Sequence, residues 1–164
     1  MEENKKEKKS LANWLKTVIG GTGICGTIFY LVLILGIGRD LIEKYPEFSY
    51  WFTPWTVFII ISAIPCYITL IIGWKIANNI GNDKSFIIEN AVLLGVVSKL
   101  AAVDSGFFLV GNIALWLTEM NHPSVVIASL FVSFVGVVFS VAMAVISHQT
   151  RKAAQLKEES ELTI

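Results

Sequence analysis

The segment that decides the fold covers residues 86–118 and reads FIIENAVLLGVVSKLAAVDSGFFLVGNIALWLT. It is a long apolar stretch, yet it contains three charged residues, Glu89, Lys99 and Asp104. If Lys99 lies among the lipid headgroups, the 19 residues from 100 to 118 still cross the roughly 30 Å hydrocarbon core of a bilayer as a helix. Asp104 then lies about one turn inside the hydrocarbon, where a carboxylate is expensive and is a candidate for function.

The composition of the whole chain agrees with a membrane location. The 164 residues are 54% hydrophobic and only 16% charged, and the mean hydropathy is +0.65, which is too apolar for an ordinary soluble domain of this length. The formal net charge is zero. The composition therefore gives no reason to expect direct binding of nucleic acid.

Three further apolar stretches flank the central one. Residues 17–38 are free of charge, the stretch 56–74 contains Pro65, which predicts a kink, and the stretch 125–147 is again uncharged. We therefore predict an all-α membrane protein, a bundle of four transmembrane helices, with spans at about 17–38, 56–74, 100–118 and 125–147.

The remaining residues complete the predicted organisation. The domains that we expect are a basic cytoplasmic leader at 1–10, a four-helix transmembrane domain at 11–148 and a cytoplasmic tail at 149–164. An amphipathic lead-in at 86–99 precedes the third span along or below the interface, where the charges of Glu89 and Lys99 cost little.

The distribution of basic residues predicts the orientation. With both termini in the cytoplasm, eleven of the thirteen lysines and arginines lie inside and only Arg39 and Lys44 lie outside. Such an asymmetry is typical of the positive-inside rule. The aromatic residues near Arg39 then form a belt at the outer face, with Tyr45, Tyr50 and Trp55 among them.

Small residues recur at helical spacing in two of the spans and indicate close helix packing. Gly20, Gly23 and Gly26 follow one another at steps of three in the first span. In the fourth span the stripe consists of Ser129, Ser133, Gly136 and Ser140, continued by Ala144 and Ser147. We expect each stripe to face a neighbouring helix.

Asp104 is the best single candidate for a buried polar site, because a membrane carboxylate can carry a proton or bind a cation. Asn112 follows eight residues later, within the same broad helical sector. The alternative is a structural hydrogen bond from Asp104 to a serine or threonine of a neighbouring helix.

The other reactive side chains give weaker patterns. Cys25 and Cys66 are expected at similar depths, so they form either a redox pair or two small buried apolar residues. His122 and His148 lie on opposite faces and cannot share a metal. Because no nucleophile elbow, phosphate loop or zincin motif occurs, the sequence predicts no metal, no cofactor and no enzymatic activity.

The tail is a candidate site for a protein partner. The residues that we single out are Arg151, Lys152, Glu161, Leu162, Thr163 and Ile164. An exposed helix can dock in a groove, and an extended end can add a strand to a sheet of the partner. The alternative is a solvated, frayed terminus.

Several of these features together resemble a known family. They are the Lys-rich start, the four spans, the aromatic connection at Tyr45 and Pro46, the turn with Asn79, Asn82, Lys84, Ser85 and Phe86, and the ending Glu161-Leu162-Thr163-Ile164. The chain resembles the small bacterial membrane proteins grouped as domain of unknown function 2975. Asp104 is a departure from the apolar pattern that we expect there.

The family has no established activity or catalytic residues, so the resemblance transfers none to this chain. Members are often encoded beside a small helix-turn-helix regulator, which implies a membrane partner that senses for or restrains that regulator. We therefore predict a non-enzymatic, multi-pass protein of the bacterial inner membrane that works with such a cytoplasmic regulator and that can also form oligomers. The alternatives are a small transporter or channel using Asp104, an immunity protein against a membrane-active peptide, and an oxidoreductase using Cys25 and Cys66.

Overall fold

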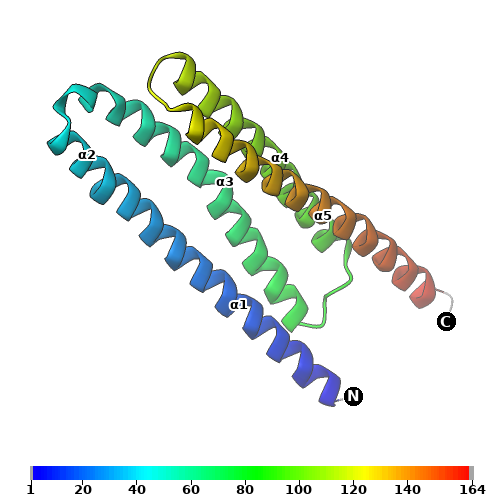
Figure 1. The fold of residues 1–164 in the computed structure, drawn as a ribbon. Helices are drawn as coiled ribbons and strands as arrows, with labels where there is room; N and C mark the ends of the chain where they lie inside the picture. Colours follow the sequence, from blue (N-terminus) through cyan, green and yellow to red (C-terminus); the bar gives the residue numbers. More distant parts are fainter. Residues whose placement is uncertain (1, 163–164) are drawn as a thin grey trace.

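The computed structural model describes residues 2–162, and the side chains of residues 6–160. Within that range every element is helical. The first rod consists of α1 (Glu2–Leu31), the π-helical segment η1 (Val32–Ile37) and α2 (Gly38–Lys44). The short 3-10 helix η2 (Pro46–Phe48) reverses the chain into α3 (Ser49–Gly81), and α4 (Ile88–Leu117) and α5 (Pro123–Leu162) follow (Figure 1).

Four of these rods are long and apolar enough to cross a bilayer. They cover residues 6–44, 46–81, 88–117 and 123–160, and each includes one of the predicted spans. The predicted all-α bundle of four transmembrane helices is therefore confirmed. The chain passes through Pro65 without a break in α3, and the π-helical turn in the first rod has no counterpart in the sequence prediction.

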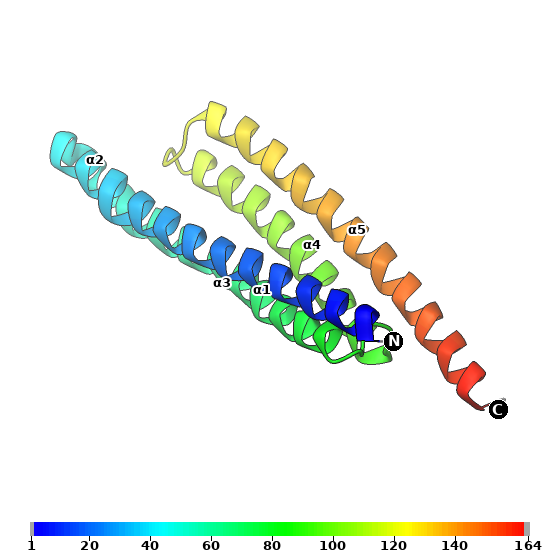
Figure 2. The same ribbon diagram turned by 90° about the horizontal axis from the view of Figure 1, so that it is seen from below.

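The rods form two hairpins that stand side by side. α1 packs on α3, α4 packs on α5, and α3 joins the hairpins through its contacts with α4. α1 and α5 are thus the first and last helices in this chain of contacts, and Figure 2 shows α1 in front of α3, with α4 beside them and α5 on the far side of α4. Both chain ends lie at the same end of the bundle (Figures 1 and 2), although the side of the membrane they face stays a prediction.

The α4–α5 hairpin is held by close backbone approach. Ser98 Oγ donates to the Ser140 carbonyl oxygen at 2.8 Å, and Ser140 Oγ donates back to the Ser98 carbonyl oxygen at 2.7 Å. Four residues before Ser140, a Cβ added at Gly136 would collide with Ser105 Oγ. The small-residue stripe of the fourth span therefore faces α4.

The rest of that stripe is also covered. Ser129 and Ser133 are buried, and Ser129 Oγ donates to the Val126 carbonyl oxygen of its own helix. Ser133 Oγ is buried without a hydrogen-bond partner among the described residues. Further along α5, Ser147 Oγ donates to the Ala91 carbonyl oxygen at 2.6 Å. The seam thus extends over most of the length of α4.

The α1–α3 hairpin packs less closely at the glycine stripe of α1. A Cβ added at Gly23 would lie 3.6 Å from Leu70 Cδ1, and one at Gly26 would lie 3.7 Å from Tyr67 Oη. Both are ordinary van der Waals distances. Nothing lies within 4 Å of such a Cβ at Gly20, so this position does not face a neighbouring helix closely.

The glycines of α3, in contrast, approach α1 closely. A Cβ added at Gly73 would lie 3.3 Å from Ile19 Cδ1, and one at Gly81 would lie 3.1 Å from Ala12 Cβ.

The two hairpins meet where α3 contacts α4. Phe58 is buried between the hairpins, stacks on Phe108 with ring centroids 5.6 Å apart, and lies so close to Gly111 that a Cβ there would collide with its ring. At the end opposite the termini, Trp55 Nε1 donates to the Met120 carbonyl oxygen at 2.8 Å. These contacts fix the hairpins to one another at that end.

An asparagine pair closes the α3–α4 turn at the end that carries the termini. Asn79 Nδ2 donates to Asn90 Oδ1 at 2.7 Å, and Asn90 Nδ2 donates to the carbonyl oxygens of Lys84 and Ser85. Asp83 adopts a left-handed backbone conformation with φ 62°. The turn thus ends α3 at its C-cap Asn82, whereas α4 follows the N-cap residue Ile87, which makes no side-chain capping bond.

The predicted lead-in and tail continue the neighbouring spans. α4 begins at Ile88 and runs as one helix through the rest of the predicted lead-in and the predicted span as far as Leu117, with Asn90, Val97 and Ser98 buried. α5 similarly continues into the tail as far as Leu162. The boundaries of the bilayer along these helices stay a prediction.

Candidate functional site

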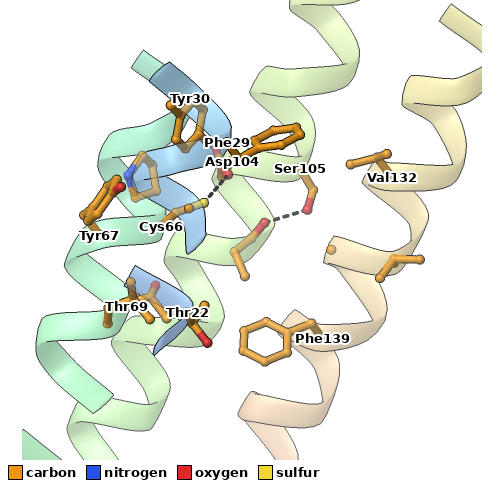
Figure 3. A pocket seen from close by; sticks show the side chains of 16 residues that line it. Thr22, Phe29, Tyr30, Cys66, Tyr67, Thr69, Asp104, Ser105, Val132 and Phe139 are labelled. Carbon is orange, nitrogen blue, oxygen red and sulfur yellow. Dashed lines mark hydrogen bonds between the residues drawn. The ribbon is translucent and has the colours of Figure 1, made fainter. Parts of the chain in front are cut away.

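A cavity of about 580 Å³ lies between the two hairpins at mid-height of the bundle. All four long helices contribute to its wall (Figure 3). Most of the lining side chains are apolar, including Phe29 from α1 and Phe139 from α5. The polar groups that line it are Thr22, Tyr30, Cys66, Tyr67, Thr69, Asp104 and Ser105.

Asp104 is the one acidic residue in this wall, and no lysine, arginine or histidine belongs to the lining among the described side chains. Its Oδ2 lies 3.8 Å from Cys66 Sγ, at the long limit for a thiol hydrogen bond (Figure 3). Its Oδ1 is buried and has no hydrogen-bond partner within the described range. The expected partner, a serine or threonine, is thus replaced by a weakly donating thiol.

The surroundings of Asp104 come from three helices because α3 presents Cys66 and α1 presents Phe29 and Tyr30 on the same side of the cavity (Figure 3). Ser105, the neighbour of Asp104, turns its Oγ toward the Ala101 carbonyl oxygen of its own helix at 2.7 Å. It therefore does not satisfy the carboxyl group.

Asn112 lies in a different environment and does not line the cavity. The residue is fully buried, its Nδ2 donates to the Phe108 carbonyl oxygen at 2.8 Å, and its Oδ1 accepts from Asn121 Nδ2 at 3.1 Å. This network fixes the α4–α5 turn to α4. The structure therefore does not bring Asp104 and Asn112 together, and it gives Asn112 a structural partner that the sequence did not indicate.

The cysteines do not form a disulfide. Cys25 and Cys66 are both free and exposed on the protein surface, and only Cys66 lines the cavity. No group of three potential metal ligands occurs among the described histidine, cysteine, aspartate and glutamate residues.

Tyr30, Tyr67 and Thr22 are site residues that the sequence reading missed. Tyr67 Oη shares a 2.7 Å hydrogen bond with Thr27 Oγ1, across the α1–α3 interface. A hydroxyl group in the middle of an apolar span could have singled out these residues as candidates. The sequence alone did not show which helix those hydroxyls would face.

Charged contacts gather at the end that carries the termini, away from the cavity. Lys75 Nζ lies 2.7 Å from Glu89 Oε1, and Lys8 Nζ lies 2.6 Å from Asp83 Oδ1. Glu89 stands in the first turn of α4, ahead of the predicted span, where the hydrogen bond and the charge of Lys75 lower the pKa of its carboxyl. The first pair links α3 to the first turn of α4, and the second links the start of α1 to the α3–α4 turn.

The proposed partner-binding tail is only partly described. Arg151 and Lys152 are exposed on α5, which extends past the start of α4 (Figure 2). Glu161 and Leu162 belong to the helix, but their side chains lie outside the described residues, as do Thr163 and Ile164 entirely.

The four long apolar helices, with a carboxylate-containing cavity between them, define a polytopic α-helical membrane protein. The chain belongs to the family described as protein of unknown function (DUF2975), whose profile matches residues 36–164. It is similar to the uncharacterized membrane protein YoaS of Bacillus subtilis (strain 168), with 24% identity over 153 residues that cover 92% of this chain and 96% of the relative. No solved structure matches the chain.

The family resemblance and the membrane class predicted from the sequence are thereby confirmed. The matched range includes Cys66 and Asp104, whereas the α1 wall of the cavity precedes it. The inner membrane as the location, the orientation, the regulator and the alternative functions stay predictions.

Proposed function

We propose that this protein is a non-enzymatic sensor of the bacterial inner membrane, which binds a small molecule in the cavity and restrains or releases a cytoplasmic helix-turn-helix regulator. One observation carries the proposal: the cavity lies between two hairpins whose mutual contacts are much less extensive than the contacts within the α4–α5 hairpin. A molecule at that position contacts both hairpins at once.

The arrangement supports transmission along the helices. At the end opposite the termini, Trp55 and Phe58 hold the hairpins together. At the other end the α3–α4 turn, with its Asn79–Asn90 and Lys75–Glu89 contacts, also joins the hairpins. A change in separation at the cavity therefore acts on α1 and α5, the first and last helices in the chain of contacts, and α5 continues beyond α4. Helical rods transmit small rotations of this kind over long distances because their packed interiors deform little.

The positive-inside asymmetry supports a cytoplasmic location for that end. The exposed bases Arg151 and Lys152 and the Lys75–Glu89 pair all lie there. A regulator docked on the end of α5 would be close to the α3–α4 turn. The surface offered to it is polar and charged, as expected for a reversible interaction.

Co-purification tests the proposal. The full chain, tagged away from its tail, is coexpressed with a small helix-turn-helix protein of the kind that the family resemblance implies, and is purified in a non-ionic detergent. Removing residues 149–164, or reversing the charges with Arg151→Glu and Lys152→Glu, should reduce recovery of the regulator at least tenfold. The control Arg39→Glu, at the opposite end, should leave recovery unchanged. Equal recovery with all variants would rule out the tail as the docking site.

A second candidate function, a small transporter, is favoured by the buried Asp104 Oδ1 that has no partner in the described part of the chain. A carboxyl in that state can exchange a proton or a cation during a transport cycle. Native protein in liposomes should then show proton-coupled flux that Asp104→Asn abolishes. Liposomes with native protein that show no such flux would exclude this function.

A further inference from the structure

We propose that the cavity between the hairpins binds a lipophilic organic cation, with Asp104 as its counter-ion. The inference rests on the proposed sensor function and names the chemical class of the molecule that the sensor detects. It starts from an imbalance of charge: the cavity wall contains one carboxyl group and no basic side chain among its sixteen lining residues, all of which are described.

The protein itself leaves the carboxyl without compensation. The ion pairs Lys8–Asp83 and Lys75–Glu89 lie at the end that carries the termini, and among the described side chains Asp104 receives only the distant thiol of Cys66. A carboxylate in an apolar medium either takes up a proton or pairs with a cation. A positively charged ligand therefore supplies what the cavity lacks.

The same wall argues against a divalent metal ion. Divalent metals such as Ca²⁺ take six to eight oxygen ligands, and no group of three acidic, histidine or cysteine ligands occurs in the described chain. The wall instead presents aromatic rings, with Phe29 and Tyr30 beside Asp104 and Tyr67 and Phe139 elsewhere in the lining (Figure 3). Aromatic faces attract organic cations through the ring quadrupole, and they do so most strongly where water is excluded.

The location of the cavity explains why the cation should be lipophilic. Its wall includes residues of α1 and α5, two helices that pack on α3 and α4 and have no extensive contact with each other, so we infer that a molecule enters between them from the surrounding lipid. The volume of about 580 Å³ lies within the range of roughly 300–1,000 Å³ that small-molecule sites occupy. A compact cation with an apolar surface fits these conditions.

Two ions of the same shape and opposite charge test the inference. Purified protein in a non-ionic detergent is titrated with tetraphenylphosphonium and, separately, with tetraphenylborate, and binding is measured by equilibrium dialysis. We expect the cation to bind at least tenfold more tightly than the anion. Asp104→Asn should abolish this preference, Asp104→Glu should retain it, and Asp40→Asn, in α2 and outside the cavity lining, should not change it.

The outcomes separate this inference from the proposed function. Equal binding of both ions, binding of neither, or a preference that survives in Asp104→Asn protein of native helical content would overturn the cation assignment. If both ions bind equally and Val135→Trp, which fills the cavity, abolishes both, the cavity is a ligand site of another class and the sensor function survives. If the cation binds as expected but does not alter recovery of the regulator, the assignment holds and the sensor function fails.

Discussion

The two hairpins of this protein are built on different principles. In the α4–α5 hairpin, serine side chains of each helix bond to the backbone of the other, and Gly136 lets Ser105 approach. In the α1–α3 hairpin the glycine stripe of α1 is in ordinary contact or faces open space, and the close approaches are steric ones at Gly73 and Gly81 of α3. Among the described residues, these two helices exchange no hydrogen bonds from side chain to backbone, and one side-chain pair joins them. Reciprocal hydrogen bonds therefore fix the axial register of α4 against α5, whereas fewer specific hydrogen bonds set the register of α1 against α3.

The comparison explains where the cavity forms. Small residues along one face of α5 bring it close to α4, while the larger Phe29 and Phe139 keep α1 and α5 apart on either side of the cavity. Within a membrane, helices gain little from burying apolar surface, so close packing and hydrogen bonds decide which pairs associate tightly. A tight pair beside a loose pair is a suitable arrangement for a site that opens to the lipid.

The largest effect is expected from a bulky residue in the tight seam. Gly136→Leu should destabilise the protein by about 3 kcal/mol, because the added atoms collide with Ser105 and force the helices apart. The matched substitution Gly20→Leu in α1 should change the stability little, since nothing lies within 4 Å of its added Cβ. Unfolding in mixed micelles, followed by circular dichroism, measures both. Equal losses would contradict the difference between the hairpins.

The four spans and the stripe in α5 were predictable because they depend on residues close in sequence. Hydropathy over some twenty residues defines a span, and steps of three and four place Ser133, Gly136 and Ser140 on one face. The partner of the stripe was not predictable. Which turn of α4 faces Gly136 depends on the axial offset between two helices, and no local pattern encodes that offset.

The candidate site, like the fold, could be predicted only where it depends on residues close in sequence. A charged residue inside a span singled out Asp104, but its neighbours Cys66 and Tyr30 belong to other helices whose rotation the sequence did not specify. Asn112 was linked to the wrong neighbour. Helical periodicity places it on the same broad side of the helix as Asp104, but in the structure it is hydrogen-bonded to Asn121 of the α4–α5 turn, away from the cavity. The prediction that the first part of this helix is an amphipathic lead-in rested on the charges of Glu89 and Lys99, and the sequence did not specify the pairing of Glu89 with Lys75.

A second prediction concerns the cavity. Asp104→Leu should stabilise the protein by about 1–2 kcal/mol, because it removes a buried carboxyl oxygen that has no partner in the described chain. The control Asp40→Leu lies on an exposed part of α2 and should change the stability little. The same unfolding assay measures both variants. A loss of stability in Asp104→Leu would instead assign Asp104 a structural role.

A third prediction examines the serine exchange in the tight hairpin. Ser140→Ala should destabilise by about 1 kcal/mol, since it removes the bond to the Ser98 carbonyl oxygen. Ser133→Ala removes a buried hydroxyl without a described partner, so it should be neutral or slightly stabilising. Comparing the two variants separates the contribution of the hydrogen bond from the effect of losing one oxygen atom. Identical effects on stability would show that the reciprocal bonds between Ser98 and Ser140 contribute nothing.

The smallest effect is expected in the loose hairpin, where one side-chain bond joins Thr27 Oγ1 to Tyr67 Oη. Thr27→Val keeps the shape of the side chain and should cost at most about 0.5 kcal/mol, because the Thr27 hydroxyl also bonds to the Gly23 carbonyl oxygen and is exposed. Thr17→Val is the matched control, since the Thr17 hydroxyl bonds within α1 to the Asn13 carbonyl oxygen. The difference between the two variants isolates the contact with α3. If it equalled or exceeded the effect of Ser140→Ala, the two hairpins would be held equally firmly, and the cavity could not be attributed to a difference between them.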